Sequence, residues 1–407
     1  MLWVGRVSLQ GISTHPNTVF EHKDLSFPSC ASRQRFDVTA ALRDGGGGGG
    51  GKGVCCCWFL TMSCWTWGGE EERTHAAIGR VRSVAEAIGG RALLVPRSVR
   101  LASRISFSRL ACGGAHCLAV TGEGVAFSWG WNAMGQLGDG TTTSRFKPAP
   151  IPVLVAHGVR VGAVAAGAAH SAALVDFDGV SAEGGSTSTA AGAAFDPALA
   201  HVHATLGRIQ CYTWGAGKSC QLGYRVYENP EGVSPLPRPV EVLPAMLQTD
   251  SLALFGPNDV DSRYDALACG SAHTIVLTAS GSIITWGANG FGQCSRASVA
   301  PHVDPARPRF FADEKLVSVS CGGVHTLVLT AAGRLLAFGC NAAGQLGAGS
   351  ISSSVQPVPQ MVGLPLGAVV AQIACGEEFS CVLLSDGCLL TWGFGGCGQL
   401  GHGSRRS

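Results

Sequence analysis

Four histidines occupy one position of a phrase that recurs along this chain, and histidine is a common metal ligand and general base near neutral pH. Each comes three residues after a glycine, and the steps from the first histidine to the second and from the third to the fourth are 54 and 52 residues. Since one histidine falls in each copy, we expect the four to lie too far apart to share a metal ion. We predict instead that each fixes a turn by hydrogen bonding through one ring nitrogen. They are His116, His170, His273 and His325.

An aromatic residue joined to glycine follows each histidine by thirteen residues, and a glutamine comes seven residues later. In the second copy the first of these spacings is stretched to 44 residues, and the last copy has Phe379 in place of histidine. We expect the tryptophan side chains at this position to pack between neighbouring repeats. The aromatic residues are Trp129, Trp214, Trp286, Phe338 and Trp392, and the glutamines are Gln136, Gln221, Gln293, Gln345 and Gln399.

Cysteine is the second residue type that could be reactive or bind a metal, and the chain has 17 cysteines. No repeated Cys-x-x-Cys pairing suggests a zinc site. Four cysteines share one repeat position, and we predict that they are small buried apolar side chains, which favours a reducing compartment. They are Cys112, Cys269, Cys321 and Cys375.

Other catalytic and cofactor patterns are weak. Residues 46–51 are glycines followed by Lys52, as in part of a phosphate-binding loop, but Gly53 stands where Ser or Thr is needed and no strand precedes it. The repeats contain no paired carboxylates and no nucleophile with a recognisable base. The sequence therefore predicts no enzyme activity, no cofactor and no metal site.

The elements that carry these residues read as short β-strands. In the copy 316–349, β-prone runs at 317–320, 325–330 and 334–338 are separated by glycine-containing turns, which indicates a hairpin. The nearly continuous apolar character of the runs predicts strands covered on both faces. A turn glycine recurs eight residues after the histidine position, where we expect positive φ. These glycines are Gly124, Gly281, Gly333 and Gly387, with Gly179 one residue later in the stretched copy.

A proline-containing stretch ends each copy, such as 147–153 or 356–359. Proline is tolerated only in edge strands, so each copy is expected to form about four strands with one at the edge. Small antiparallel sheets that repeat at this period predict an all-β propeller.

The entry Ala-Cys-Gly-x-x-His and the loop Gly-Gln-Leu-Gly, seen at 111–116 and 135–138, resemble the regulator of chromosome condensation repeat family. The resemblance spans about 94–403 and implies a propeller, typically of seven blades. Five copies are clear here, and a sixth is faint at 65–68 and 96–101, so we expect about five to seven blades. The sequence allows three interpretations of ring closure. The ring is open, the N-terminal region supplies the closing segment, or the chain is an incomplete gene product.

The chain divides into a leader and a repeat region. Residues 1–53 end in polyglycine and predict a disordered or non-conforming leader, and 54–407 predict the propeller. Insertions are expected at about 179–207 and about 225–264. The second contains Leu252, Leu254 and Phe255, which we take as a candidate partner-contact loop.

Composition limits the function classes. Charged residues make up 14% of the chain and the net charge is +2, so no direct binding of nucleic acid is expected. No apolar run is long enough for a membrane span or a secretory segment, which predicts an intracellular protein, cytoplasmic or nuclear, that is not secreted. The first hypothesis is a non-enzymatic scaffold that binds a protein partner through loops on one face. The alternatives are a guanine-nucleotide exchange factor for a small Ran-like GTPase, as the resemblance implies, and a fragment of a larger multidomain regulatory protein.

Overall fold

The computed structural model describes residues 56–60, 63–68, 93–99, 105–156, 158–176, 209–224, 232–241, 267–297, 300–349 and 355–403. The predicted leader 1–53, the first predicted insertion and the candidate contact residues Leu252, Leu254 and Phe255 lie outside these residues. So does the turn glycine Gly179.

Each of the first four clear copies folds into a four-stranded antiparallel sheet with the strands in chain order. The first two sheets are β4 (Phe107–Cys112), β5 (His116–Thr121), β6 (Ala126–Gly130) and β7 (Arg145–Pro150), then β8 (Arg160–Ala166), β9 (His170–Asp176), β10 (Ile209–Ala216) and β11 (Val233–Pro239). The next two are β12 (Leu267–Cys269), β13 (His273–Leu277), β14 (Ile283–Ala288) and β15 (His302–Ala306), then β16 (Leu316–Cys321), β17 (His325–Thr330), β18 (Leu335–Gly339) and β19 (Gln356–Met361).

Two further sheets of three strands complete the described part of the chain. The last clear copy forms β20 (Val370–Cys375), β21 (Phe379–Leu384) and β22 (Leu389–Gly393), and the faint copy forms β1 (Cys56–Leu60), β2 (Ser63–Gly68) and β3 (Leu93–Ser98). In the faint copy Gly68 faces Leu93 beside a bulge, as Gly130 faces Arg145 in the first clear copy. The last two strands of the faint repeat therefore pair in the same register as the last two strands of the first clear copy.

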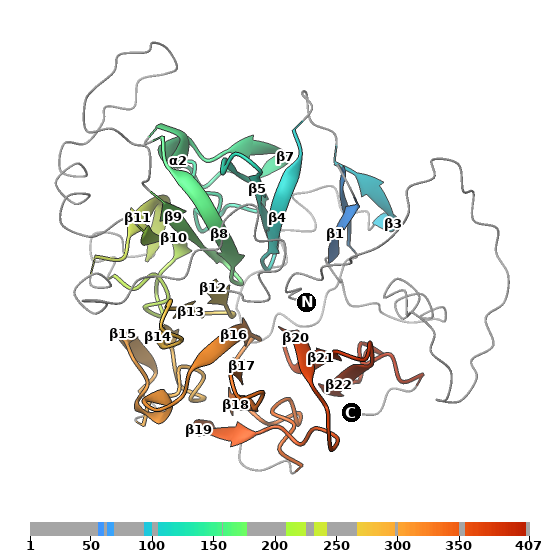
Figure 1. The fold of residues 1–407 in the computed structure, drawn as a ribbon. Helices are drawn as coiled ribbons and strands as arrows, with labels where there is room; N and C mark the ends of the chain where they lie inside the picture. Colours follow the sequence, from blue (N-terminus) through green and yellow to red (C-terminus); the bar gives the residue numbers. More distant parts are fainter. Residues whose placement is uncertain are drawn as a thin grey trace, which may run out of the picture.

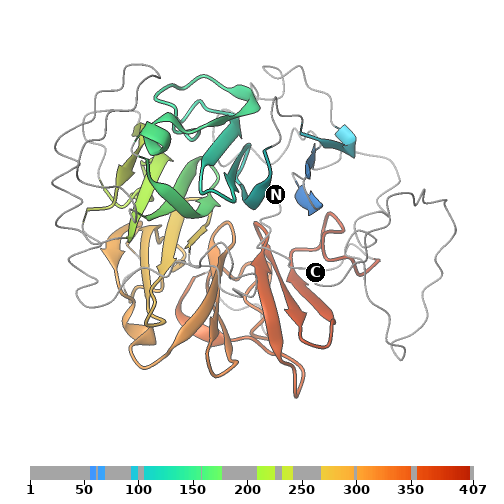
Figure 2. The same ribbon diagram turned by 45° about the horizontal axis from the view of Figure 1, so that its top comes forward.

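The sheets stand around a common centre, which confirms the predicted all-β propeller (Figure 1). Successive first strands β4, β8, β12, β16 and β20 contact one another in that order near the centre. The view in Figure 2 shows the sheet β1–β3 between the blades β4–β7 and β20–β22. Two short helices, α2 (Pro152–Ala156) and the 3-10 turn η2 (Arg309–Phe311), connect blades. Within the described residues, no helix is long and apolar enough to cross a membrane.

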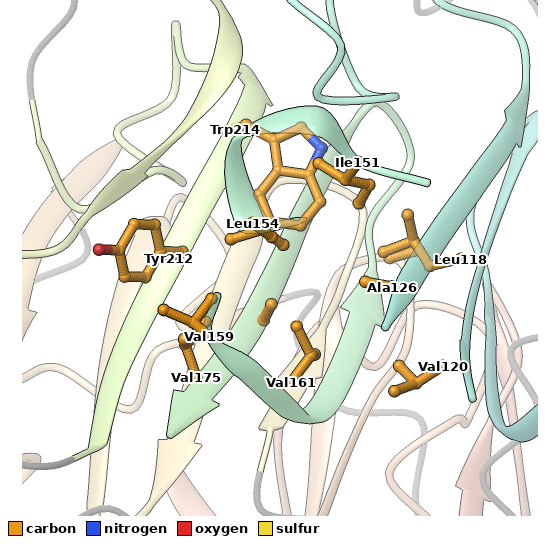
Figure 3. Packing of buried hydrophobic residues seen from close by; sticks show 12 residues of the cluster. Leu118, Val120, Ala126, Ile151, Leu154, Val159, Val161, Val175, Tyr212 and Trp214 are labelled. Carbon is orange, nitrogen blue, oxygen red and sulfur yellow. The ribbon is translucent and has the colours of Figure 1, made fainter. Parts of the chain in front are cut away.

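The core lies between blades rather than within one of them. One cluster joins Leu118 and Val120 of β5 to Val161 of β8 and to Trp214 of β10, so it fills the contact between two neighbouring sheets (Figure 3). Equivalent clusters fill the next three contacts. Every residue of β5 and β17 is buried. The continuous apolar runs are thus strands with a blade on each side, as predicted.

The turn glycines also have the predicted conformation, with φ of 88° at Gly124, 87° at Gly281, 78° at Gly333 and 90° at Gly387. The second predicted insertion needs a correction, because β11 lies inside 225–264 and forms the fourth strand of its blade. Three prolines in that strand read as a loop in the sequence. They fit because β11 is an edge strand whose outer N–H groups need no partner in the sheet.

Candidate functional site

The repeated residues meet at one end of every blade. The histidine begins the second strand and faces a glycine at the end of the third strand or one residue before it, as in the pair His325 and Gly339. The glutamine lies in the loop that leaves the third strand. We call this end the Gln-loop face, defined by the loops that carry Gln136, Gln221, Gln293, Gln345 and Gln399; the opposite end, with the turn glycines, is the hairpin-turn face.

Each histidine bonds to the following blade rather than within its own turn, and this differs from the contact predicted for it. Its Nε2 atom lies 2.9 to 3.1 Å from the hydroxyl oxygen of the serine or threonine in the next copy's second strand, one residue after the histidine position. The four pairs are His116 with Ser171, His170 with Thr274, His273 with Thr326 and His325 with Ser380.

The same hydroxyl donates to the backbone carbonyl of the preceding blade's glutamine, at 2.8 to 3.0 Å. That carbonyl also accepts a bond from an indole Nε1–H at three of the four interfaces, for example from Trp214 to Gln136 at 2.9 Å. At the interface of Gln293, Phe338 replaces tryptophan and offers no donor. The glutamine carbonyl is therefore the acceptor on which the next blade docks.

This arrangement determines where the histidine protons are. The hydroxyl has one proton, which goes to the glutamine carbonyl, so Nε2 must carry the imidazole proton and donate it to the hydroxyl oxygen. Burial lowers the pKa of His170, His273 and His325 to about 3, with neighbouring histidines a smaller cause for the first two. These side chains are neutral structural donors at ordinary pH and have no open position for substrate.

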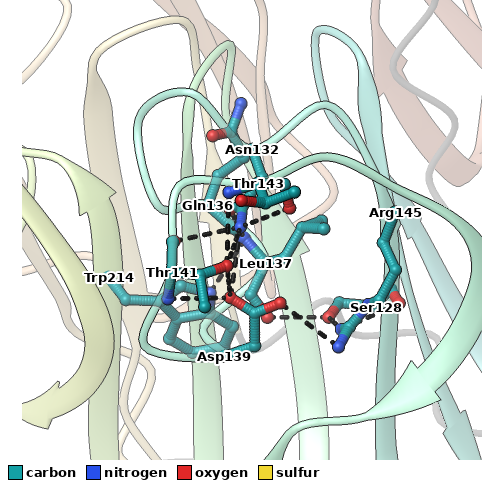
Figure 4. Close-up of polar contacts among 9 residues, drawn as sticks. All are labelled: Ser128, Asn132, Gln136, Leu137, Asp139, Thr141, Thr143, Arg145 and Trp214. Carbon is teal, nitrogen blue, oxygen red and sulfur yellow. Dashed lines mark hydrogen bonds and ion pairs between the residues drawn. The ribbon is translucent and has the colours of Figure 1, made fainter.

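The glutamine side chains are also used inside the fold. Each Oε1 accepts the backbone N–H two residues earlier at 2.8 to 3.0 Å, which closes a tight loop. In the first clear copy Asn132 adds a second network, because its Nδ2 donates to Asp139 and to the carbonyls of Thr141 and Thr143 (Figure 4). Asp139 pairs with Arg145 at 3.3 Å. The loop after β6 is thus held rigidly by buried polar groups.

Both ends of the relay of histidines and hydroxyls carry exceptions. In the first clear copy Cys117 stands where the others have serine or threonine, and it packs with Phe127 and Trp129 in an apolar cluster. In the last copy Phe379 occupies the histidine site against Gly376 and is buried. The polar relay therefore spans four interfaces and is replaced by apolar side chains at each end.

The side chains left exposed on the Gln-loop face include two apolar pairs at equivalent positions. A Cβ on Gly135 would lie 2.5 Å from the Cα of Pro235, which brings their neighbours Met134 and Leu236 to one blade junction. Gly292 approaches Pro357 in the same way, at 2.6 Å, with Phe291 and Val358 beside them. All four apolar side chains are 36 to 45% exposed.

The described part of the chain groups no metal ligands, and the repeated cysteines are buried. No group of three or more His, Cys, Asp or Glu side chains lies close enough there to hold a metal ion. Burial raises the pKa of Cys269 and Cys375 to about 12 and also raises that of Cys321, so these thiols are poor nucleophiles.

Comparison with known families agrees with this geometry. Two models described as the regulator of chromosome condensation (RCC1) repeat match the chain, one at 123–174, 280–329 and 332–383, the other at 107–136, 264–293, 316–345 and 370–399. The chain belongs to the regulator of chromosome condensation repeat family. The matched segments cover four of the five clear copies and only the beginning of the stretched second copy.

Three relatives show how far the likeness reaches. The ultraviolet-B receptor UVR8 of Arabidopsis thaliana is 30% identical over 315 residues, which are 76% of this RCC1-repeat chain and 58% of UVR8. The probable E3 ubiquitin-protein ligase HERC3 of Homo sapiens is 30% identical over 65% of this chain and 20% of its own. The crystal structure of Prp20p from Saccharomyces cerevisiae has a TM-score of 0.59 and 19% identity, over 87% of this chain and 73% of Prp20p. The chain spans less than two thirds of the curated relatives' lengths.

Proposed function

We propose that this RCC1-repeat propeller is a non-enzymatic interaction module that binds a protein partner through its Gln-loop face. The observation that carries the proposal is the exposure of four apolar side chains at two equivalent blade junctions of that face, Met134 and Leu236 at one and Phe291 and Val358 at the other. Apolar side chains that are exposed on rigid loops supply binding energy at low ordering cost.

The polar residues of the face support the same conclusion, because most of the repeated ones are already engaged. The histidines, hydroxyls and glutamines are bonded within or between blades, so they hold the scaffold rigid and are not available to a ligand. A module of this kind recognises a partner through shape and apolar contact, with scattered charges such as Lys218 and Glu377.

The relatives' names describe different whole proteins, a light receptor and a ubiquitin ligase, and the Prp20p structure was reported with binding to Gsp1p and histones. A propeller that supplies binding, with other activities held elsewhere, accommodates this range. An intracellular location, cytoplasmic or nuclear, is part of the proposal and rests on the buried thiols Cys269, Cys321 and Cys375. Membership of a longer multidomain protein stays a prediction, to be tested by sequencing the transcript past Ser407.

The test compares two double variants by affinity capture and mass spectrometry from cells of the source organism. Met134→Asp with Phe291→Asp changes the Gln-loop face, and Met361→Asp with Phe310→Asp changes the same residue types, with similar or greater exposure, on the hairpin-turn face. We expect the first variant to lose captured partners at least tenfold and the second to retain them. Loss only with the second variant would place the binding face at the other end.

A nucleotide-release assay with a panel of small GTPases tests the exchange-factor alternative in the same preparation. Under the scaffold proposal the wild-type chain leaves GDP release at its spontaneous rate. Acceleration that disappears in the Met134→Asp, Phe291→Asp variant would replace the scaffold with an exchange factor that uses the same face.

A further inference from the structure

The loops of the Gln-loop face differ from one another at their tips, which are the two residues that lie three and two positions before each glutamine. The backbone of every tip is held in the same way, because the glutamine Oε1 accepts the N–H of the second tip residue at 2.8 to 3.0 Å. The variation is therefore in side chains on a common rigid support, where we expect specificity to lie. In blade order the tips are Ala133-Met134, Lys218-Ser219, Gly290-Phe291, Ala342-Ala343 and Gly396-Cys397.

Lys218 is the one charged residue among these five tips. Its side chain is exposed, and it forms no ion pair with another residue in the part of the chain that the structure describes. The stem of the side chain lies beside Gly232, where an added Cβ would be 2.6 Å from the lysine Cγ. The neighbouring Gly217 N–H donates to the Gly232 carbonyl at 2.7 Å. The base of the lysine is thus held against its blade, while the ammonium group is open to a ligand.

Lys218 lies between the two junctions that expose apolar side chains. Its blade, β8–β11, stands between β4–β7 and β12–β15 in the ring (Figure 1). By strand register, the junction of β8–β11 with β12–β15 has Ser219 and Pro305 at the positions that hold a large apolar pair on either side. The face therefore presents apolar, basic and apolar groups in that order around the ring. The apolar residues are Met134 and Leu236 at the first junction, and Phe291 and Val358 at the third.

Two other cationic side chains near these junctions are engaged within the fold. Arg145 pairs with Asp139 at 3.3 Å. Arg296 donates to the backbone carbonyl of Asp304 at 3.4 Å, which places its guanidinium beside that acidic residue. Lys218 differs from both arginines, because its positive charge has no compensating group in the described structure. A ligand that supplies a negative charge at this point would complete the pairing.

We propose that the occupant of the Gln-loop face is an extended partner segment with an acidic residue between two apolar residues. The carboxylate pairs with Lys218, and the apolar residues cover the junctions that contain Met134 and Phe291. Packed sheets lie about 10 Å apart and an extended chain advances about 3.4 Å per residue, so junctions two blades apart correspond to roughly six residues of the segment. The inference rests on the function proposed above and names the chemistry of the partner.

The first test pans a phage-displayed library of random peptides on the full chain, with peptides of roughly 12 residues, about twice the span above. We expect the enriched peptides to have Asp or Glu between two apolar residues. Panning on the Lys218→Glu variant should instead select Lys or Arg between the apolar residues, because the reversed charge favours a cation. Selection of the same peptides by both chains, enrichment without an acidic residue, or no enrichment would overturn the inference.

The second test measures the Kd of a synthetic enriched peptide by fluorescence polarisation with variants of the full chain. Lys218→Glu should raise Kd at least tenfold, and Lys218→Arg should keep it near the wild-type value. Lys315→Glu is the matched control, since Lys315 is an exposed lysine on the hairpin-turn face whose Cγ would lie 2.5 Å from a Cβ on Gly281. Equal loss of binding with Lys218→Glu and Lys315→Glu would overturn the assigned contact.

The same peptide separates this inference from the function on which it rests. Lost binding in the Met134→Asp, Phe291→Asp variant together with unchanged binding in Lys218→Glu would overturn the acidic contact and leave the proposed binding face in place. Unchanged binding in both variants would overturn the inference and the proposed face together.

Discussion

At the scale of single residues, the molecule uses the same small set of atoms at each junction. A glutamine carbonyl receives a hydroxyl and, at three junctions, an indole from the next blade. Where Phe338 replaces tryptophan, the preceding blade has Ser295 two residues after its glutamine. Three other blades have glycine at this position, namely Gly138, Gly223 and Gly347. A Cβ on those glycines would lie 2.6 to 3.1 Å from the indole Nε1. The smaller phenyl ring therefore leaves space for the Ser295 side chain.

This pairing predicts the outcome of exchanging the ring. Phe338→Trp alone should destabilise the fold by about 1–3 kcal/mol, because the indole meets Ser295. Adding Ser295→Gly should recover most of that loss, since it restores the space, removes a non-glycine residue at φ 52° and lets Nε1 donate to Gln293. Urea unfolding of the two variants measures the difference. Equal destabilisation of the single and double variants would contradict the steric coupling.

A second prediction separates two kinds of glycine. A Cβ on Gly322 would lie 2.1 Å from the His325 ring, whereas one on Gly333 meets nothing within 4 Å and is disfavoured only by φ of 78°. We expect Gly333→Ala to lower the free energy of unfolding by about 1 kcal/mol. Gly322→Ala should lower it several-fold more, with a correspondingly larger decrease in Tm. Thermal unfolding of both variants checks this. A larger effect at Gly333 would show that backbone conformation outweighs packing against the ring.

The sequence was informative about which residues recur but not about where their bonds go. The repeat spacing identifies His325, Gly333 and Gln345 as equivalent to residues of other copies, and positive φ follows from the turn chemistry of glycine alone. The bond from His325 to Ser380 joins residues 55 apart in different blades, and no local pattern specifies such a partner.

At the scale of elements, loops on the Gln-loop face are stiffened by buried side chains rather than by regular structure. Asn132 accepts the Leu137 N–H at 2.8 Å and donates to acceptors at Asp139, Thr141 and Thr143, so one amide joins both halves of the loop after β6. The exposed apolar side chain of Met134 lies within this stiffened segment.

We therefore predict that Asn132→Ala loosens this loop while the blade stays folded. Hydrogen exchange should rise at least tenfold for amides of 137–143, because the substitution removes the bonds that hold both ends of the segment. The loop around Asn341, which has the same bond to Leu346, serves as an internal control and should be unchanged. A uniform rise in both loops would indicate global destabilisation instead.

The sequence predicted strands correctly where turn residues or proline mark them. It failed where a strand and a loop have the same composition. The hairpin around Gly333 and the proline-containing edge strand at Gln356–Met361 were predictable from turn residues and from proline itself. The strand β11 was hidden because three prolines and a neighbouring long insertion look alike in sequence.

At the scale of the whole molecule, the blades are joined by a row of neutral buried imidazoles. Between pH 6.5 and 3 the unfolded chain binds protons on His170, His273 and His325 that the folded chain does not bind. The free energy of unfolding must therefore fall as pH decreases through this window, by up to about 1.4 kcal/mol per pH unit for each histidine.

The fourth prediction follows from this linkage. Tm should be nearly constant above pH 7 and should decrease steadily from pH 6 to pH 4. His325→Phe should give a shallower decrease, because one titrating group is gone and Phe379 shows that a phenyl ring fits the same site in the last blade. Differential scanning fluorimetry across pH measures both slopes. A slope unchanged by His325→Phe would mean that other groups cause the acid sensitivity.

The propeller as a class was predictable, because repetition and apolar strands allow few other architectures. Closure of the ring was left open by the sequence, because a local pattern does not specify pairing between segments that are far apart in the chain. The exposed pairs on the Gln-loop face were missed for the same reason: Met134 and Leu236 are about one hundred residues apart in the chain.

The relay between blades has a consequence for how rings of this kind change size over evolutionary time. In the copies with His170, His273 and His325, the imidazole lies at the interface with the next blade and a hydroxyl lies at the interface with the preceding blade. Any of these copies therefore fits beside any other. Duplication or loss of one interior repeat would join compatible sides without a new interface. The copies that carry Cys117 and Phe379 each lack one of these two groups, so duplication of either would leave one interface without the bond between histidine and hydroxyl.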